Sequence, residues 1–595
     1  MCRIAGAISP SLQTGELAAF VHKMCLVQKH GGPDDNGSYT SAAFNGVLGH
    51  CRLSIIDLSE AGHQPMAYAS PGNSYTISYN GEIYNYPELK SELVRQGYSF
   101  NTNSDTEVVM AAYDKWGTGS FERLNGMFAF ALFDHGKNEV LLARDLSGIK
   151  PLYYAHTAQL FAFASEVRAL KQVPYLDKEN TNWQVYLMAY GHLPEPVTTL
   201  KDVQPLPKGS YLKYNIANGK STTSTFERAS YLEKISSRKD AVELIRQELL
   251  DAVQRHLLSD APIGVFLSGG LDSGIIALLA AKKQQRLNTV SLYFDNNEYS
   301  EKKFQDELLK QFSCEHHQFL LSENDFHNSL QSIIKAMDLP CCDGINTWYI
   351  SKYARQSGLK AVLSGIGGDE LFGGYPSFNR IRTASLLSSL PDKMLKAGRF
   401  AQSKKLRRLC YLSIDGAVGK YLFLRGQFVP SDIAAHLGAN EASVWKILEE
   451  LPQLPNLEHL SAGNQASWLE TNMYMQNQLL RDADVMSMAH GLEIRVPYLD
   501  KEFLKLVFKI QSDIKYKGKL GKQLLIDAFS SELPQSIWDR PKMGFSFPFK
   551  EWFGNSQYAN TGIAQVDAAH IKLQNGQMHW SQFFTLMLLA FYGKE

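Results

Sequence analysis

The sequence has little that would mark a secreted, membrane-embedded or nucleic-acid-binding protein. Its seven cysteines include no CxxC pair, and their odd number leaves one unpaired, so neither a disulfide scaffold nor a zinc site is indicated. No basic leader precedes an apolar stretch at the start, and no run reaches the roughly 18 apolar residues that a membrane span needs. Basic and acidic residues balance at 60 each, which leaves no electrostatic footprint for nucleic acid or an anionic membrane. These absences predict a cytoplasmic protein with reduced thiols, no nucleic-acid partner and no membrane partner.

The chain divides into two parts with different patterns. At 595 residues it is too long for one ordinary core, so two domains are the default and three are possible. Residues 2–212 are dense in short, strand-like apolar runs broken by turns, with few helical stretches, which predicts an α+β layered domain. The polar stretch 213–237 has little periodic apolar content and is the predicted linker.

Residues 238–595 predict a second domain of another kind. DAVELIRQELLDAVQRHLL, from residue 240, carries apolar residues at helical spacing, with Asp240 and Glu243 as a candidate capping pair. Strand-like and helix-like stretches then alternate, which is typical of an α/β doubly wound parallel sheet. From about residue 380 the pattern is mostly helical.

Two glycine-rich loops follow predicted strands in this second part. The first is SGGLDSG, residues 268–274, and the second is SGIGGDELFGGY, residues 364–375. Glycines let a backbone turn tightly and aim its N–H groups at an anion, and the helix that follows adds its positive end. The first loop lacks the lysine of a Walker loop, so a P-loop NTPase is not indicated. An ordinary glycine-rich turn is the structural alternative.

Each loop also contributes a carboxylate. Loops that leave neighbouring parallel strands share one crevice, which would bring Asp272 and Asp369 together. Paired carboxylates beside phosphates are a common way to hold Mg²⁺. A helix N-cap is the structural alternative for Asp272 and is compatible with a metal role. ATP with Mg²⁺ is therefore the predicted ligand.

The loop SGGLDS resembles the pyrophosphatase loop of the adenylating enzymes that include asparagine, argininosuccinate and GMP synthetases. The second loop, LRDADVMSMAHGLEIRVPYLD (480–500) and KLGKQLLIDAF (519–529) narrow the resemblance to glutamine-dependent asparagine synthetases. The resemblance implies that ATP is bound by Leu267, Ser268, Gly269, Gly270, Asp272, Ser273, Leu292, Ser364 and Gly365. It also implies that Lys522 neutralises charge on the departing pyrophosphate.

Two positions depart from the family pattern. Gly274 stands where the first loop often has a final serine, which removes a hydroxyl contact. Ile366 stands where the asparagine-forming bacterial and animal enzymes have glutamate, and isoleucine can neither bind a cation nor act as a base. This form of the second loop resembles a divergent bacterial branch, some of whose members amidate carboxylates other than aspartate.

The opening MCRIAGAISP places a cysteine directly after the initiator methionine. Removal of Met1 would leave a thiol and a free α-amine on one carbon, a nucleophile with its own base. The start of a core strand is the structural alternative.

Residues 2–212 resemble a class II glutamine amidotransferase domain, on the basis of Cys2, GHCRLSIIDLS (49–59), YNGEIYN (79–85), SDTE (104–107) and GMFAFALFD (126–134). The resemblance implies an N-terminal-nucleophile hydrolase sandwich with αββα layers.

The same resemblance assigns roles around Cys2. Asn80 and the N–H of Gly81 would form the oxyanion hole, and Arg52 would bind the glutamine α-carboxylate. Glu82 and Asp105 would face the α-ammonium. Without the resemblance, Arg52 would be taken as a surface charge and Asn80-Gly81 as a hairpin turn.

The expected function is glutamine hydrolysis in the first domain and ATP-dependent adenylation of an acceptor carboxylate in the second, joined by an ammonia channel. Aspartate is the first acceptor considered, and a uronic acid sugar or a secondary metabolite is the alternative raised by Ile366. A β-lactam-forming synthetase and a non-enzymatic glutamine sensor remain as other hypotheses. The first would lack the N-terminal cysteine and the second would show eroded ATP loops. Relatives are often dimers, which leaves a homodimer open.

Overall fold

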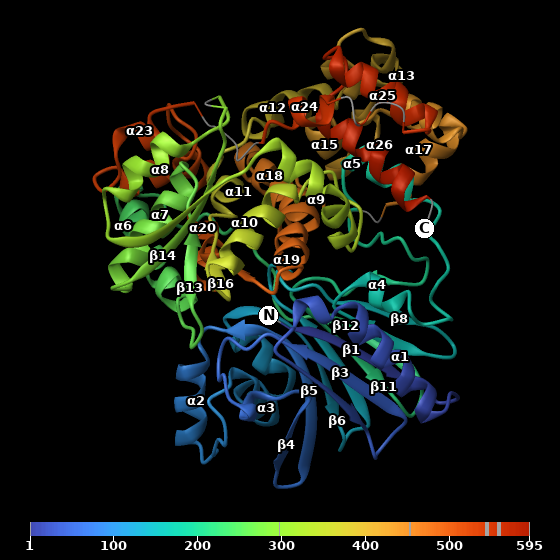
Figure 1. Cartoon of the computed structure of the whole chain (residues 1–595), viewed down its shortest axis with the longest axis vertical. Helices are drawn as coiled ribbons and strands as arrows, with labels where there is room; N and C mark the ends of the chain where they lie inside the picture. The colour runs from blue at the N-terminus through green and yellow to red at the C-terminus, as the bar shows by residue number, and fades with distance from the viewer. Residues whose placement is uncertain are drawn as a thin grey trace.

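The computed structural model describes residues 2–593, apart from 297, 452–453, 542–546, 556–557 and 559–560, and apart from the side chains of 404 and 405. In Figure 1 the first domain, blue to cyan, lies below the second, and the N-terminus lies where the two meet. Within the described ranges, no helix is both long and apolar enough to cross a membrane.

The first domain stacks two antiparallel six-stranded sheets, ordered β10-β8-β9-β1-β3-β2 and β12-β11-β7-β6-β5-β4. The strands are β1 (Arg3–Ile8), β2 (Asp35–Thr40), β3 (Gly46–Arg52), β4 (Met66–Ser70), β5 (Asn73–Ile83), β6 (Gly126–Asp134), β7 (Glu139–Arg144), β8 (Tyr153–His156), β9 (Phe161–Ala164), β10 (Gln204–Pro205), β11 (Ser210–Asn215) and β12 (Lys220–Thr225). Helix α1 (Thr14–Val27) packs on the first sheet, and α2 (Tyr86–Arg95) and α3 (Asp105–Trp116) pack on the second. The predicted αββα sandwich is confirmed.

Strand β6 shows why these layers form. Phe128 and Phe130 pack under α2 and α3, whereas Ala131 and Phe133 face the other sheet. Successive side chains of a strand point to opposite faces, so a strand covered on both faces is apolar throughout.

The predicted linker 213–237 contains regular structure. It includes the end of β11 and all of β12, which pairs with β11 in the register Tyr211↔Ser224. Strand β12 is an edge strand with mostly exposed polar side chains, so it has no apolar alternation from which it could be predicted. The connection between the domains is therefore shorter, residues 226–237, and Leu232 N donates to Phe508 O at 2.8 Å.

The second domain is built on a parallel five-stranded sheet with the order β15-β14-β13-β16-β17. The strands are β13 (Ile263–Phe266), β14 (Leu287–Tyr293), β15 (Cys314–Leu320), β16 (Ala361–Leu363) and β17 (Glu493–Arg495). The flanking helices are α6 (Arg238–His256), α7 (Leu271–Lys283), α8 (Lys302–Leu309), α9 (Glu323–Ala336) and α10 (Ile345–Gln356). This confirms the doubly wound class. The N-cap of α6 is Ser237, whose side chain accepts from Asp240 N, so the predicted Asp240–Glu243 capping pair is wrong.

The remainder is helical, as predicted, and most of its helices lie in the upper part of Figure 1. Its helices are α11 (Gly368–Phe372), α12 (Ser377–Leu387), α13 (Asp392–Ala397), α14 (Lys404–Arg407), α15 (Gly416–Arg425), α16 (Pro430–Leu437), α17 (Glu441–Glu449), α18 (Ala462–Leu469), a π-helix (Glu470–Leu480), α19 (Arg481–Met488), α20 (Lys501–Lys509), α21 (Ser512–Lys515), α22 (Gln523–Phe529), α23 (Gln535–Trp538), α24 (Phe549–Gly554), α25 (Ala564–Gln574) and α26 (Trp580–Tyr592).

Candidate active sites

The first candidate site surrounds Cys2 at the start of β1. Its backbone nitrogen donates to Asn80 Oδ1 at 3.2 Å, and Cys2 is 8% exposed. The Oδ1 of Asn80 accepts this hydrogen bond, which leaves Nδ2 as the donor of the same amide. Asn80 Nδ2 is buried and has no hydrogen-bond partner among the described residues. A buried donor without an acceptor is costly unless a ligand supplies one. The predicted oxyanion donor therefore lies beside the predicted nucleophile.

Gly81 and Arg52 are held by close packing. A Cβ at Gly81 would lie 2.3 Å from Met127 O on β6, so only glycine lets β5 lie this close to its neighbour. Arg52 Nη1 donates to Ser59 O at 2.9 Å and Nη2 to Asp57 O, which fixes the guanidinium against the loop after β3. Burial raises the pKa of the Cys2 thiol, and the buried Arg52 lowers it by a smaller amount.

The two predicted ammonium ligands are both buried. Asp105 accepts from Tyr79 Oη at 2.7 Å and from Ile83 N at 2.9 Å, and burial raises its pKa to about 6. Burial also raises the pKa of Glu82 well above its ordinary value, although Arg495 Nη2 lies 3.4 Å from Glu82 Oε1. Arg495 comes from β17 of the second domain, so a residue of that domain contacts the predicted glutamine pocket.

A buried ionic cluster joins the domains next to Cys2. Arg3 is fully buried, and its Nε lies 2.7 Å from Glu166 while Nη1 lies 2.8 Å from Asp484 on α19. Lys150 Nζ lies 3.9 Å from the same Asp484 and has no hydrogen-bond partner among the described residues. Sequence reasoning assigned no role to these residues. In the sequence, only Asp484 of this cluster and Arg495 beside Glu82 could have been noticed, because both lie within the motif 480–500.

The second candidate site is a cavity of about 530 Å³ between the two glycine-rich loops. Strands β13 and β16 are parallel neighbours, so the loops after Phe266 and Leu363 leave the same edge of the sheet. Of the predicted ATP-binding residues, the structure places on the cavity wall Leu267, Ser268, Gly270, Asp272, Ser273, Leu292, Ser364 and Gly365. Gly269 lies behind this wall, where its carbonyl accepts from Arg540 Nη2 at 2.7 Å. Arg540 lines the cavity and was not predicted.

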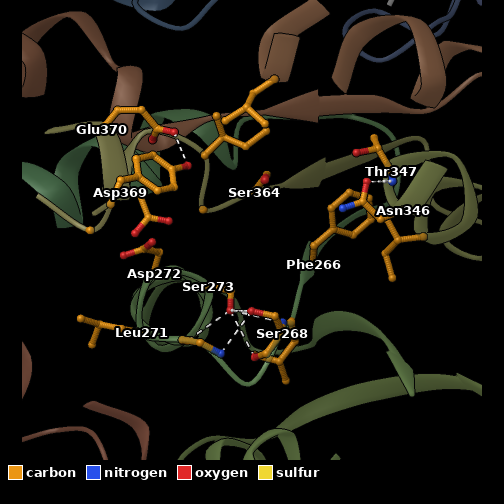
Figure 2. Close-up of a pocket in the computed structure, with 18 of the residues that line it drawn as sticks. Phe266, Ser268, Leu271, Asp272, Ser273, Asn346, Thr347, Ser364, Asp369 and Glu370 are labelled. Carbon is orange, nitrogen blue, oxygen red and sulfur yellow. Dashed lines mark hydrogen bonds between the residues drawn. The ribbon is translucent and has the colours of Figure 1, made fainter. Parts of the chain in front are cut away.

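Lys522 holds the two predicted metal ligands together. Its Nζ lies 2.7 Å from Asp272 Oδ2 and 2.7 Å from Asp369 Oδ1, and these carboxylates raise the pKa of Lys522 above its ordinary value. In Figure 2 the two carboxylates lie next to each other and point toward one another. The glycines around them are required, because a Cβ at Gly368 would lie 2.6 Å from Asp272 Oδ1 and one at Gly374 1.8 Å from Asp369 Oδ1.

These carboxylates suit Mg²⁺ by donor type, since they offer hard oxygen atoms from two loops at one point. In the part of the chain that the structure describes, no cluster of three or more His, Cys, Asp or Glu residues could hold a metal. Mg²⁺ at Asp272 and Asp369 would thus take its other ligands from water and substrate phosphates, as it commonly does.

The cavity wall also carries polar groups that sequence reasoning missed. Glu370 accepts from Tyr375 Oη at 2.7 Å, and burial raises the pKa of Glu370 to about 7. Asp482 accepts from Cys341 Sγ at 3.0 Å, and burial likewise raises its pKa to about 7. Carboxyls with such pKa values can take up or release a proton near neutral pH. Ile366 also lines the cavity.

A buried thiol beside a side-chain amide in an αββα sandwich, joined to a parallel sheet with two glycine-rich loops at one edge, defines a glutamine amidotransferase coupled to a synthetase. Residues 1–227 match the glutamine amidotransferase domain, and residues 244–573 match asparagine synthase. The chain belongs to the asparagine synthase family.

Relatives match along nearly the whole chain. Asparagine synthetase (glutamine-hydrolyzing) 1 of Bacillus subtilis is 32% identical over 582 residues, 93% of this chain and 88% of that protein. Asparagine synthetase (glutamine-hydrolyzing) 3 of the same organism is 28% identical, over 97% of this chain and 92% of that protein. Asparagine synthetase B (glutamine-hydrolyzing) of Escherichia coli is 28% identical, over 92% and 82%.

Proposed function

We propose that this protein hydrolyses glutamine at Cys2 and uses ATP to activate an acceptor carboxylate, which the released ammonia converts to an amide. ATP gives AMP and pyrophosphate, and glutamine gives glutamate. The observation that carries the proposal is the pair of sites itself, because one chain places Cys2 beside Asn80 and places Lys522 between Asp272 and Asp369.

In the first site, the proposed nucleophile is the Cys2 thiolate. Met1 lies outside the described residues, and its removal would turn the Cys2 nitrogen into an α-amine. An α-amine has an ordinary pKa near 8, which suits it to accept the thiol proton and pass it to departing ammonia. Asn80 Oδ1, at 3.2 Å, orients that nitrogen, and Asn80 Nδ2 donates to the oxyanion that forms on the glutamine amide. Arg52 would bind the α-carboxylate, with Asp105 and Glu82 facing the α-ammonium.

In the second site, the proposed role of Lys522 is to neutralise negative charge, first that of Asp272 and Asp369 and then that of the departing pyrophosphate. Its ammonium is shared by Asp272 and Asp369. Mg²⁺, when bound at those carboxylates, would neutralise phosphate charge. Lys522 would then be displaced toward the pyrophosphate as it leaves, while the N-terminus of α7 and the loop 268–274 hold the phosphates by backbone N–H groups.

Ammonia is proposed to travel inside the protein, because bulk water at neutral pH would protonate it and remove its nucleophilic lone pair. The two sites are connected through Arg495. Its guanidinium lies 3.4 Å from Glu82 of the glutamine pocket, and its carbonyl accepts from Ser364 N of the second loop at 2.8 Å. A single residue of β17 thus touches both sites.

Aspartate is the proposed acceptor, in line with the names of the relatives. Ile366 on the cavity wall favours a second candidate, another carboxylate such as a uronic acid sugar. The test is pyrophosphate release from ATP with glutamine and Mg²⁺, with and without aspartate, and asparagine followed by mass spectrometry. Aspartate-dependent pyrophosphate with matching asparagine supports aspartate. Glutaminase activity without aspartate-dependent pyrophosphate release rules out aspartate as the acceptor and leaves the second candidate.

A further inference from the structure

Residues 377–408, called here the basic lobe, carry a strong local charge in a chain that is neutral overall. The lobe has nine basic residues and one acidic residue, Asp392, whereas the whole chain has 60 of each sign. The basic residues are Arg380, Arg382, Lys393, Lys396, Arg399, Lys404, Lys405, Arg407 and Arg408. The span has an excess of eight positive charges, two of which are paired with Glu441 and Asp432 of neighbouring helices, and the remaining excess favours a polyanionic partner.

The basic lobe also exposes large apolar side chains. Phe400 is 77% exposed and Leu386 is 75% exposed, the two highest values for large apolar side chains in the described ranges. Five of the thirteen exposed large apolar side chains fall within 386–406, the others being Leu390, Met394 and Leu406. Scattered single exposures are normal on a protein surface, but this concentration within basic sequence marks an interaction site.

The fold holds these side chains outward on a small core of its own. Ala384 of α12, Leu395 of α13 and Leu412 form a separate buried cluster beneath the lobe. Adjacent residues of a helix point in different directions. Because Leu395 points into this cluster, its neighbour Met394 is 60% exposed. In Figure 1, α13 lies at the end of the molecule opposite the first domain, so the lobe is accessible without obstruction from the glutamine site.

Some of the arginines anchor the lobe rather than face solvent. Arg399 pairs with Glu441 at 2.5 Å, and Arg407 pairs with Asp432 at 2.6 Å. Arg382 and Lys393 are exposed. The lobe is thus fixed to the helical part by some of its basic residues, whereas Arg382 and Lys393 are accessible to a partner.

We propose that the basic lobe binds an anionic phospholipid membrane surface. Exposed apolar side chains interspersed with basic residues match the interfacial mode, in which apolar groups enter the acyl boundary and cations stay at the headgroups. Each basic residue near an anionic leaflet adds to the attraction. A second copy of the lobe is disfavoured as the occupant, because it would bring an equal positive charge. The five apolar side chains are distributed over α12, α13, α14 and the turns between them, which suits a laterally uniform surface.

Docking in this way would bring the synthetase cavity close to the bilayer. Helix α12 begins at Ser377, two residues after Tyr375 of the cavity wall, and its 11 residues span about 16 Å. The cavity would thus lie within roughly one helix length of the membrane.

The test uses the full-length protein and sedimentation with vesicles of phosphatidylcholine, with or without phosphatidylglycerol. We expect binding to the anionic vesicles, weakening as salt is raised, and little binding to phosphatidylcholine alone. The double variants Leu386→Ser/Phe400→Ser and Arg382→Glu/Lys393→Glu should each reduce binding at least about tenfold, which corresponds to about 1.4 kcal/mol.

Matched controls lie on the first domain. Leu26 is 55% exposed and Lys178 is exposed, and neither lies in the basic lobe, so Leu26→Ser and Lys178→Glu should bind like the wild type. Glutaminase activity without vesicles should be the same in all variants, which keeps this test separate from the proposed function. Equal binding by the lobe variants, or no anionic preference, would overturn the proposal. So would retention on an acidic polypeptide without vesicle binding, which would assign the surface to an acidic protein.

Discussion

Arg3 Nη1 lies 2.8 Å from Asp484 Oδ2, so the residue that follows the proposed nucleophile is ion-paired with the second domain. Both side chains are almost completely buried. A buried charge that loses its partner cannot be rescued by water, which makes such pairs far more sensitive to single substitution than exposed pairs. The position of Cys2 thus depends on how the two domains pack.

Asp484→Asn should lower the free energy of unfolding by about 3 kcal/mol or more, because Arg3 and Lys150 both lose a buried counter-charge. It should also reduce glutaminase activity by displacing β1. Chemical denaturation and glutamate release would measure the two effects. The control is Glu92→Gln, which breaks an exposed pair with Arg123 and should cost less than about 1 kcal/mol. If Asp484→Asn also lowered the free energy of unfolding by less than about 1 kcal/mol, Asp484 would not have the proposed role in joining the domains.

Cys2→Ala should abolish glutamine-dependent amidation and leave ammonia-dependent amidation intact, since only the first site needs the thiol. The two activities would be compared in one assay with glutamine or an ammonium salt as nitrogen source. Cys25→Ala is the matched control, because Cys25 is a free, partly exposed cysteine that the proposal leaves without a role. Loss of both activities in Cys2→Ala would show that the sites are not separate.

Asp272→Asn should stop pyrophosphate release with either nitrogen source, because it removes a proposed Mg²⁺ ligand and a partner of Lys522. Glutamine hydrolysis should persist. Asp240→Asn, at an exposed position on α6, serves as the control. Normal pyrophosphate release by Asp272→Asn at limiting Mg²⁺ would remove the metal assignment.

Lys522→Met should lower kcat for pyrophosphate release by about 10²–10³, the typical cost of removing one group that stabilises charge in the transition state. Lys519→Met, three residues away and exposed, should be close to the wild type. Steady-state kinetics with saturating ATP separates this loss from weaker ATP binding. A change in the KM for ATP with no change in kcat would instead show that Lys522 binds ATP before the reaction and does not stabilise the transition state.

Asp105→Asn should raise the glutamine KM at least about tenfold while stabilising the fold at high pH. Burial raises the pKa of Asp105 from 3.8 to about 6, so folding disfavours its charged form. This cost is absent below about pH 4, develops between pH 4 and pH 6, and amounts to about 3 kcal/mol above pH 6. Relative to the wild type, Asp105→Asn should therefore gain stability at pH 8 and lose the gain toward pH 4, as thermal melts would show. A constant difference across that range would refute the linkage.

Local patterns were enough to predict much of the fold. Strand β6 could be recognised because its apolar residues form a continuous short run, and the loops 268–274 and 364–375 because glycines directly follow buried strands. Strands β12 and β15 lie at sheet edges with polar side chains, and β17 has only three residues, so none of them carries a local apolar signal. The basic lobe was missed because the charge was summed over the whole chain.

By itself the sequence determined the chemistry available to this protein: a cysteine behind the initiator methionine, glycine-rich loops with Asp272 and Asp369, and motifs typical of a glutamine-dependent synthetase. Only the tertiary structure decided which charges meet. Arg3 with Asp484, and Glu82 with Arg495, are joined across more than 400 residues of chain. Such pairs depend on burial and on the packing of two separately formed cores, and neither is encoded in the residues around either partner.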